Sequence, residues 1–461
     1  MKKIAILLLF VLLVGTGAGC TGGSSSATLE NVELTVWRVF DDDDAFDTII
    51  NNYRVIHPNV KINYRKLRYD EYENELIRAF AENRGPDIVS LHNTWLPAYQ
   101  VLLAPMPESV NLTYQETQGT LRKETVVVSR TEPTMSMRQL ESTFVEQIAQ
   151  DVILDYQVDT DVSPVEKIYG LPLAMDSLAL YYNKDLFNTA GIATPPQSWG
   201  EFQDDVIALT TYDKSGNVDQ SGAALGTSQN VERASDIVSL LMMQNGTAMT
   251  DQKNKITFNT ITNDVADGVF PGFDAVSFYT DFANPTKEVY TWNNTFDSSF
   301  ESFTNGETAM FLGYSYHIPL IQTASPKLNY GIAPVPQISG GREINFANYW
   351  VESVTASCDN PDWAWDFVQF ETSEDQVVSY LDAAKKPTAL RNLISSQLND
   401  SYLGAFAEQT LTAQSWYHGY DSGVMEDVFE DLINAVLSGS YEDPGDIMDS
   451  AATQVSGTYK K

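Results

Sequence analysis

The sequence predicts an α/β fold in which a mostly parallel sheet carries helices on its faces. Residues 33–38 and 60–64 alternate apolar and polar side chains, as half-buried strands do, and another strand starts at residue 87. Between these strands, apolar residues recur at helical spacing over 46–53 and 72–80. Strands that alternate with helices pair in parallel, and such sheets bind ligands beyond the carboxyl ends of their strands.

Residues 104–165 interrupt this alternation. We expect a long loop or inserted excursion over 113–138, because this stretch is rich in Thr, Glu and Arg, and a helix over 140–156. An apolar run over 168–182 then predicts a strand.

The composition is typical of a large globular protein with an acidic surface. Hydrophobic residues make up 43% of the 461 residues and charged residues 20%, which allows two or three ordinary domains or one large two-lobed protein. The formal net charge of −34 repels phosphate backbones, so we expect no nucleic-acid partner. The acidity favours solubility or adaptation to salt, and an acidic pocket for a cationic ligand stays open. The two cysteines, Cys20 and Cys358, provide no disulfide framework.

The first twenty residues have the pattern of an export signal. Two lysines precede an unbroken apolar run over 4–14, which is too short to span a bilayer as a helix but fits a signal-peptide core. Small residues and then Cys20 follow, as in a lipobox, although Gly17 stands where a branched apolar residue is usual. We therefore expect a signal peptide over 1–19, lipidation of Cys20, a flexible tether over 20–30, and export to the outer face of the cytoplasmic membrane. The alternative is an ordinary cleaved signal peptide with a chance cysteine.

No catalytic motif emerges from the sequence. It has no HExxH, GxSxG or GxGxxG pattern and no GxxxxGK followed by Ser or Thr, and its four histidines lack metal-ligand spacing. Carboxylates are plentiful, so a pair suited to glycoside hydrolysis remains an open alternative. We expect a protein that is not an enzyme and that carries no cofactor and no metal.

The most specific pattern lies near the middle of the chain. It reads YGLPLAMDSLALYYNKDLF over 169–187 and PPQSWGEF over 195–202. These segments resemble those of the extracellular solute-binding proteins of family 1, the group that includes maltose-binding protein. The resemblance continues through GPDIV, FTNGETAM, YGIAPVP and NPDWAWDF, which begin at residues 85, 303, 330 and 360. It covers most of residues 33–440 and leaves out 104–165.

The resemblance implies a two-lobed, periplasmic-binding-protein-like α/β fold, in which each lobe is a mostly parallel sheet with flanking helices. Strands that cross between the lobes would lie near 170–176, near 332–336 and near Pro387. Ligand would bind between the lobes, which close by hinge bending. The implied divisions are 31–170 plus 335–385 for the first lobe, with 104–165 as an insertion, and 171–334 plus 386–450 for the second.

The implied function is capture of a small solute, expected to be a carbohydrate, for delivery to the permease subunits of an ABC importer. Three alternatives stay open. The same fold could bind a cationic solute such as a polyamine, serve as a surface sensor or scaffold without transport, or act on glycans as an enzyme.

Sugar capture needs planar polar groups that bond hydroxyls and aromatic faces that cover the C–H side of the ring. The resemblance places both kinds of residue around the cleft. The implied ligand-binding residues are Asp41, Asp42, Asn93, Trp95, Asp176, Tyr314, Tyr316, Asn348 and Trp350. Structural alternatives exist, in which the tryptophans pack in a core or hinge, the adjacent acids are solvated, and Asp176 caps a hinge hydrogen bond.

Overall fold

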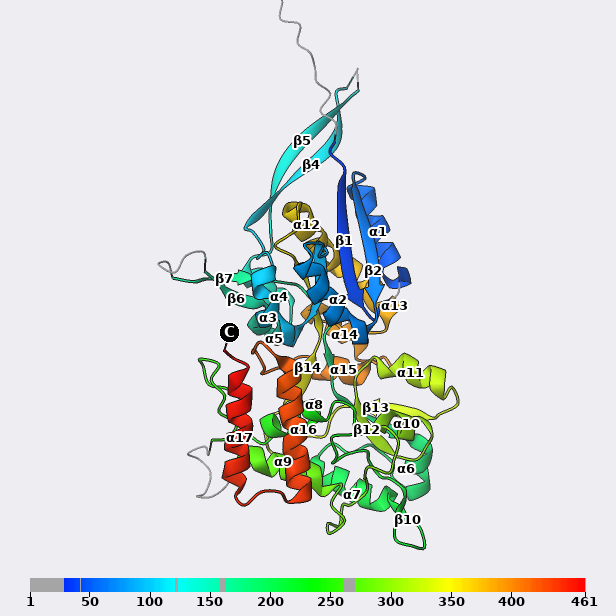
Figure 1. Ribbon diagram of the computed structural model, residues 1–461. Helices are drawn as coiled ribbons and strands as arrows, with labels where there is room; N and C mark the ends of the chain where they lie inside the picture. The colour runs from blue at the N-terminus through cyan, green and yellow to red at the C-terminus, as the bar shows by residue number, and fades with distance from the viewer. Residues whose placement is uncertain (1–28, 42, 121–122, 158–162, 261–269, 461) are drawn as a thin grey trace, which may run out of the picture.

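The computed structural model describes residues 29–41, 43–120, 123–157, 163–260 and 270–460. Figure 1 shows two bodies, one above the other, with a long hairpin that projects from the upper one. The expected signal peptide, Cys20 and Asp42 lie outside the described residues. Of the helices that the structure describes, none combines the length and the apolar character needed to cross a membrane.

Two separate hydrophobic cores divide the chain. One core defines lobe 1, the upper body in Figure 1, and takes its buried residues from 32–175 and 347–394, together with Ala413. The other defines lobe 2 and takes its buried residues from 178–346 and 403–455. The prediction of a two-lobed α/β protein is confirmed.

The structure corrects two of the expected lobe boundaries. Residues 335–346 pack in lobe 2 because β13 (Tyr330–Ala333), which leads into them, pairs with a strand of the lobe 2 sheet. Residues 386–394 pack in lobe 1, where their apolar side chains join its core. The crossing expected near 332–336 therefore lies later, at β14 (Asn345–Asn348).

Lobe 1 is built on a four-stranded sheet in the order β15-β3-β1-β2. β1 pairs in parallel with both β2 and β3, as predicted, whereas β15 runs antiparallel to β3. The carboxyl ends of β1 and β3 therefore meet at one edge of the sheet. The strands are β1 (Val32–Val39), β2 (Val60–Leu67), β3 (Ile88–His92) and β15 (Trp350–Val354), and the predicted helices between the first three are α1 (Asp43–Ile56) and α2 (Tyr69–Ala81).

Some of the remaining helices of lobe 1 begin at recognisable signals. α4 starts with a capping box between Ser136 and Gln139, and α12 has a proline in its first turn. The remaining helices are α3 (Leu96–Tyr99), α4 (Met137–Thr143), α5 (Glu146–Val152), α12 (Pro361–Glu371), α13 (Glu374–Ala384) and α14 (Ile394–Gln397).

Of the two forms expected over 113–138, the long loop is wrong, and the segment belongs to an excursion of two paired strands. β4 (Ser109–Gln118) and β5 (Glu124–Pro133) form the antiparallel hairpin that projects at the top of Figure 1. The Thr-rich, Val-rich composition suits strands, and the base of the hairpin buries Val110 and Leu112 in the lobe 1 core. The helix expected over 140–156 is broken twice: between α4 and α5, and again after α5, where β6 (Ile153–Tyr156) pairs with β7 (Val165–Ile168).

The lobe 2 sheet differs from the expected parallel sheet. Its strands β9 (Ala179–Asn183), β12 (Met310–Gly313) and β13 pair antiparallel in the order β12-β9-β13. Long helical excursions separate these strands in the chain, so their direction does not follow from a simple strand–helix–strand repeat. A small hairpin of β10 (Thr211–Tyr212) and β11 (Val218–Gln220) lies apart from this sheet.

Helices surround the lobe 2 sheet. α8 is buried along its whole length, which explains why it carries almost no amphipathic pattern. The helices are α6 (Lys184–Ala190), α7 (Trp199–Leu209), α8 (Ala234–Gln244), α9 (Pro271–Asp281), α10 (Ser299–Thr304), α11 (His317–Ala324), α15 (Gly404–Gln409), α16 (Ser422–Ser438) and α17 (Pro444–Gly457).

A small three-stranded sheet joins the lobes. β8 (Asp176–Ser177), β14 and β16 (Ala413–Gln414) pair in the order β16-β14-β8. The buried residues before β8 belong to lobe 1 and those after it to lobe 2, so the chain crosses between the lobes here. The crossing expected at 170–176 lies at this position.

Candidate functional site

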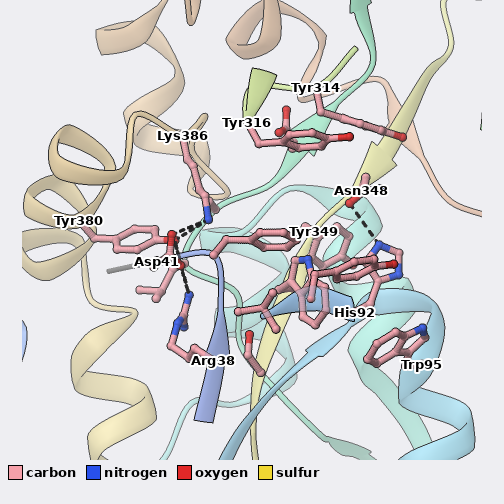
Figure 2. Close-up of a pocket in the computed structure, with 18 of the residues that line it drawn as sticks. Arg38, Asp41, His92, Trp95, Tyr314, Tyr316, Asn348, Tyr349, Tyr380 and Lys386 are labelled. Atoms are coloured by element: carbon pink, nitrogen blue, oxygen red, sulfur yellow. Dashed lines mark hydrogen bonds and ion pairs between the residues drawn. The ribbon is translucent and has the colours of Figure 1, made fainter. Parts of the chain in front are cut away.

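A cavity of about 290 Å³ lies between the lobes, at the carboxyl ends of β1 and β3. Lobe 1 contributes the residues that follow these strands, and lobe 2 contributes the segment after β12, the residue before α8 and part of α16. Figure 2 shows the tyrosines of lobe 2 above the pocket and the polar and aromatic residues of lobe 1 around and below it.

Seven of the nine residues implied by the resemblance line this one cavity. They are Asp41, Trp95, Asp176, Tyr314, Tyr316, Asn348 and Trp350. Asp42 lies outside the described residues. Asn93 does not line the pocket, because its side chain is buried and its amide donates to Asp151 Oδ2 at 3.2 Å.

Asp41 is the centre of a charged network at one side of the pocket. Its carboxylate accepts hydrogen bonds from Lys386 Nζ at 2.7 Å, from Arg38 at 2.9 Å and from the Tyr380 hydroxyl at 2.9 Å. Burial alone would raise the pKa of Asp41, but the charges of Lys386 and Arg38 lower that pKa to about 2. Asp41 is therefore a fixed anion, and its donors hold the loop after β1 in place.

A second layer of charge supports this network from inside lobe 1. Arg38 also forms an ion pair with Glu352, which accepts a hydrogen bond from Ser90 Oγ at 3.0 Å. Nearby Glu371 is fully buried, and neither carboxyl oxygen has a hydrogen-bond partner among the described residues. Burial, with the adjacent charge of Glu352, raises the pKa of Glu371 well above its usual range. This environment therefore favours the protonated form of the Glu371 side chain.

Phe40 projects from a strained backbone into an aromatic cluster. Its φ of 71° is left-handed, a conformation that bulky L-residues avoid. The ring remains 46% exposed and stacks on Tyr69, with a centroid distance of 5.6 Å, and on Tyr316, with a centroid distance of 6.4 Å and an interplanar angle of 2°. Since Tyr316 belongs to lobe 2, the Phe40–Tyr316 stack joins the two walls of the pocket.

Trp350 connects this cluster to the opposite side of the pocket. Its ring meets Phe40 edge-on at 5.8 Å and Trp95 edge-on at 5.3 Å. It also meets His92 edge-on at 5.5 Å. Burial, with the nearby charge of Arg233, lowers the pKa of His92 to about 4, so its imidazole is neutral near pH 7.

The lobe 2 wall carries a second charged group, which sequence reasoning missed. Arg233 donates to both carboxylate oxygens of Asp236 at 2.8 Å and to both of Glu426, at 3.1 and 2.8 Å. The Tyr314 hydroxyl donates to Asp236 Oδ2 at 2.6 Å. Arg233 is therefore held by α8 and α16 together, with the tyrosine beside it.

Asp176 acts inside the hinge as well as at the pocket. Its Oδ2 accepts hydrogen bonds from the Ser315 backbone N–H at 2.9 Å and from Ser315 Oγ at 2.6 Å, and its Oδ1 accepts from the Ser177 N–H at 2.9 Å. Burial raises the pKa of Asp176 to about 7 despite these donors. The side chain thus ties the first crossing to the loop that carries Tyr316.

Other lining residues were not predicted from the sequence, among them Phe40, Tyr69, Arg233, Tyr380, Lys386 and Glu426. Phe40 and Tyr69 follow the ends of β1 and β2, so the rule that ligands bind at strand ends could have included them. The other four reach the pocket from distant positions in the chain, and only the packing of helices brings them there. The described residues contain no group of three or more His, Cys, Asp or Glu side chains arranged to hold a metal ion.

Comparison with known protein families identifies the family of this chain. A family model described as bacterial extracellular solute-binding protein matches residues 40–378. The chain belongs to this family. The resemblance drawn from the sequence is thereby confirmed, and the pocket lies between the two lobes of a solute-binding protein.

Individual relatives are distant. This solute-binding protein is 20% identical to the galactooligosaccharide-binding protein of Bacillus subtilis (strain 168) over 473 aligned positions, which cover 100% of this chain and 98% of the relative. A binding protein of Brucella abortus (strain 2308) is 46% identical, but over 55 residues, which cover 11% of this chain and 13% of that protein. The crystal structure of the cyclic α-maltosyl-1,6-maltose-binding protein of Arthrobacter globiformis matches with a TM-score of 0.71 and 18% identity, over 93% of this chain and 99% of the other. At that identity, the structural match concerns the fold.

Proposed function

We propose that this protein captures a carbohydrate in the pocket between its lobes and delivers it to an ABC importer. One observation carries the proposal: both lobes contribute aromatic faces to a pocket whose sides hold fixed polar groups. The aromatic faces are those of Phe40, Tyr69, Tyr316 and Trp350.

The chemistry of these walls suits a sugar. Aromatic faces pack against the C–H side of a pyranose ring, while carboxylates, amides and hydroxyls bond its oxygens. The full-length relative in Bacillus subtilis is named for binding galactooligosaccharides, and a solute-binding lipoprotein of Streptococcus pneumoniae is named for maltooligosaccharides. Nothing in these comparisons supports the alternative of a cationic solute.

Closure of the two lobes around the ligand would connect binding to transport. A ligand that contacts both Tyr316 and Phe40 binds more tightly when the lobes are close together, so binding shifts the hinge equilibrium towards the closed form. The permease then distinguishes loaded protein by its shape. The proposal includes export and attachment of a lipid to Cys20, which would keep the protein beside its importer.

The capture function is tested with purified protein and a broad panel of saccharides. Binding is expected to raise the melting temperature, to change tryptophan emission and to reduce the radius of gyration measured by X-ray scattering. Trp350→Phe should reduce the emission change, because Trp350 lines the pocket, and the remaining change should come from Trp95, which lines it too. Trp199→Phe is the matched control, since Trp199 is buried in the lobe 2 core and should leave the ligand response intact. The absence of any thermal shift across the panel at millimolar saccharide would overturn the proposal.

The anchor is tested separately in cells. Wild-type protein should incorporate labelled fatty acid and sediment with membranes, whereas Cys20→Ser should lose the label and become soluble. Unchanged labelling of Cys20→Ser would refute lipidation at this residue and leave the capture function untouched.

A further inference from the structure

We infer that the pocket takes a short, uncharged saccharide of one or two sugar units. This inference rests on the proposed function and narrows it to a ligand class. Three features of the pocket carry it: its volume, its closed sides and the pairing of its charges.

The volume of the pocket leaves little room for a longer saccharide. The cavity measures about 290 Å³. Pockets that hold drug-sized ligands run from roughly 300 to 1,000 Å³, so this one lies at the small end of the range. One or two sugar rings fit such a space, whereas additional units of an oligosaccharide would remain outside it.

Bonded side chains close the pocket on two opposite sides (Figure 2). On one side, the Lys386 ammonium donates to Asp41 Oδ1 at 2.7 Å and to the Tyr380 hydroxyl at 3.2 Å. On the other, His92 Nε2 lies 3.1 Å from Asn348 Oδ1. A saccharide that continued past either side would have to break the charge-assisted network of Lys386 and Asp41 or displace the His92 imidazole, and both changes are costly.

The charges of the pocket disfavour an anionic ligand. Among the described lining residues, the cationic side chains are Arg38, Lys386 and Arg233, and each is already paired with at least one carboxylate. Glu426, one of the carboxylates paired with Arg233, lines the pocket as well. A carboxylate on the ligand would therefore meet neighbouring carboxylates without an uncompensated cation to receive it.

The length limit is tested by calorimetry on ladders of saccharides with one linkage each. Suitable probes are maltose, galactobiose and mannobiose together with their parent monosaccharides and their higher oligomers up to the hexasaccharide. In the ladder that binds, affinity should reach its maximum at one or two units and change by less than about threefold on further extension. A rise of about tenfold or more from disaccharide to tetrasaccharide would overturn the length limit.

The charge preference is tested with isosteric pairs, in which glucose is compared with glucuronate, galactose with galacturonate and mannose with mannuronate. In the sugar series that binds, the uronate should be weaker by about tenfold or more at low ionic strength. Glu426→Gln removes one of the two carboxylates on Arg233 and should recover a large part of the uronate's lost affinity. Asp431→Asn is the matched control, because Asp431 lies on the same helix but outside the pocket.

The outcomes separate this inference from the proposed function. Equal or tighter binding of the uronates, or no effect of Glu426→Gln on them, would overturn the charge argument while capture of carbohydrate stands. Binding that requires long oligomers would overturn the size argument in the same way. Failure of every saccharide, short or long, charged or neutral, would instead remove the proposed function itself.

Discussion

Replacing Phe40 by glycine and, separately, by alanine separates the strain in its backbone from the contacts of its ring. Both variants remove the ring. Only alanine keeps a Cβ in the left-handed conformation, which costs roughly 1–2 kcal/mol for an L-residue. Glycine relieves that cost but loses about 0.5–1 kcal/mol through the greater freedom of the unfolded chain. At φ 71°, Phe40→Gly should therefore be more stable than Phe40→Ala by about 0.5–1 kcal/mol.

Tyr316 provides the matched control for this comparison. It also lines the pocket and is 37% exposed, but its φ is −63°. Here the order should reverse, with Tyr316→Ala more stable than Tyr316→Gly by about 0.5–1 kcal/mol. The entropic cost of glycine cancels between the two pairs, so the difference of differences reports the strain at Phe40 alone. We would measure the free energy of unfolding for all four variants by urea titration followed by circular dichroism.

Binding measurements on the same variants test the role of the ring. Loss of one aromatic face should weaken saccharide binding by about 1–2 kcal/mol, which is about tenfold in the dissociation constant. The loss should be the same in Phe40→Gly and Phe40→Ala. Equal stability of the two variants, or greater stability of Phe40→Ala, would refute the idea of backbone strain. Affinity within about twofold of wild type would refute a contact between Phe40 and the ligand.

Three further predictions concern charge. Asp41→Asn leaves Lys386 without its carboxylate, so it should destabilise the protein by about 3–5 kcal/mol in urea unfolding; a change under about 1 kcal/mol would contradict the network. The pKa of His92 is about 4 in the folded protein, so as pH falls the unfolded chain takes up the proton first. The free energy of unfolding should therefore fall by at most about 3 kcal/mol as pH drops from about 6.5 to 4. His92→Gln should flatten that decline, and an unaltered pH profile would contradict the lowered pKa of His92. Because the pKa of Glu371 is raised in the folded protein, burying this side chain destabilises the fold increasingly as pH rises above the pKa of the carboxyl in the unfolded chain. Glu371→Met should therefore raise the melting temperature more at pH 7 than at pH 4.5. An equal shift at both pH values would contradict the raised pKa.

The part of the fold that the sequence predicted is the part with local periodicity. β1, α1, β2, α2 and β3 follow one another at short spacing. α1 and α2 each bury one face, so their apolar residues repeat at the period of a helix, and β1 begins with the alternating burial of a strand. The β4–β5 hairpin was missed because its projecting strands are largely exposed on both faces and show no such period. The antiparallel sheet of lobe 2 was also missed, since strand direction depends on chain reversals over long helical segments.

The residues of the candidate site also differ in how far they could be predicted from the sequence. Residues that directly follow a strand of lobe 1 were predictable, because the carboxyl ends of parallel strands meet at one edge. Tyr380 and Lys386 reach Asp41 from α13 and the turn after it, more than three hundred positions along the chain, and no local pattern marks them. Arg233 is similarly placed by the packing of α8 against α16. Sequence reasoning therefore identified the edge of the pocket contributed by the sheet, and tertiary packing supplied the charges that close it.

The pocket holds its charged groups in place before a ligand binds. Its strongest polar groups already bond to one another: Asp41 to Lys386, Arg233 to Asp236 and Glu426, and Asp176 to Ser315. Such groups are held in place before a ligand arrives, so a ligand does not bear the entropic cost of ordering them. The rings remain the surfaces with apolar area still to bury, and two of them, Phe40 and Tyr316, are more than a third exposed. Affinity should therefore depend mainly on the fit of a sugar face to these rings, and the preformed charges should decide which hydroxyl pattern and which net charge are accepted.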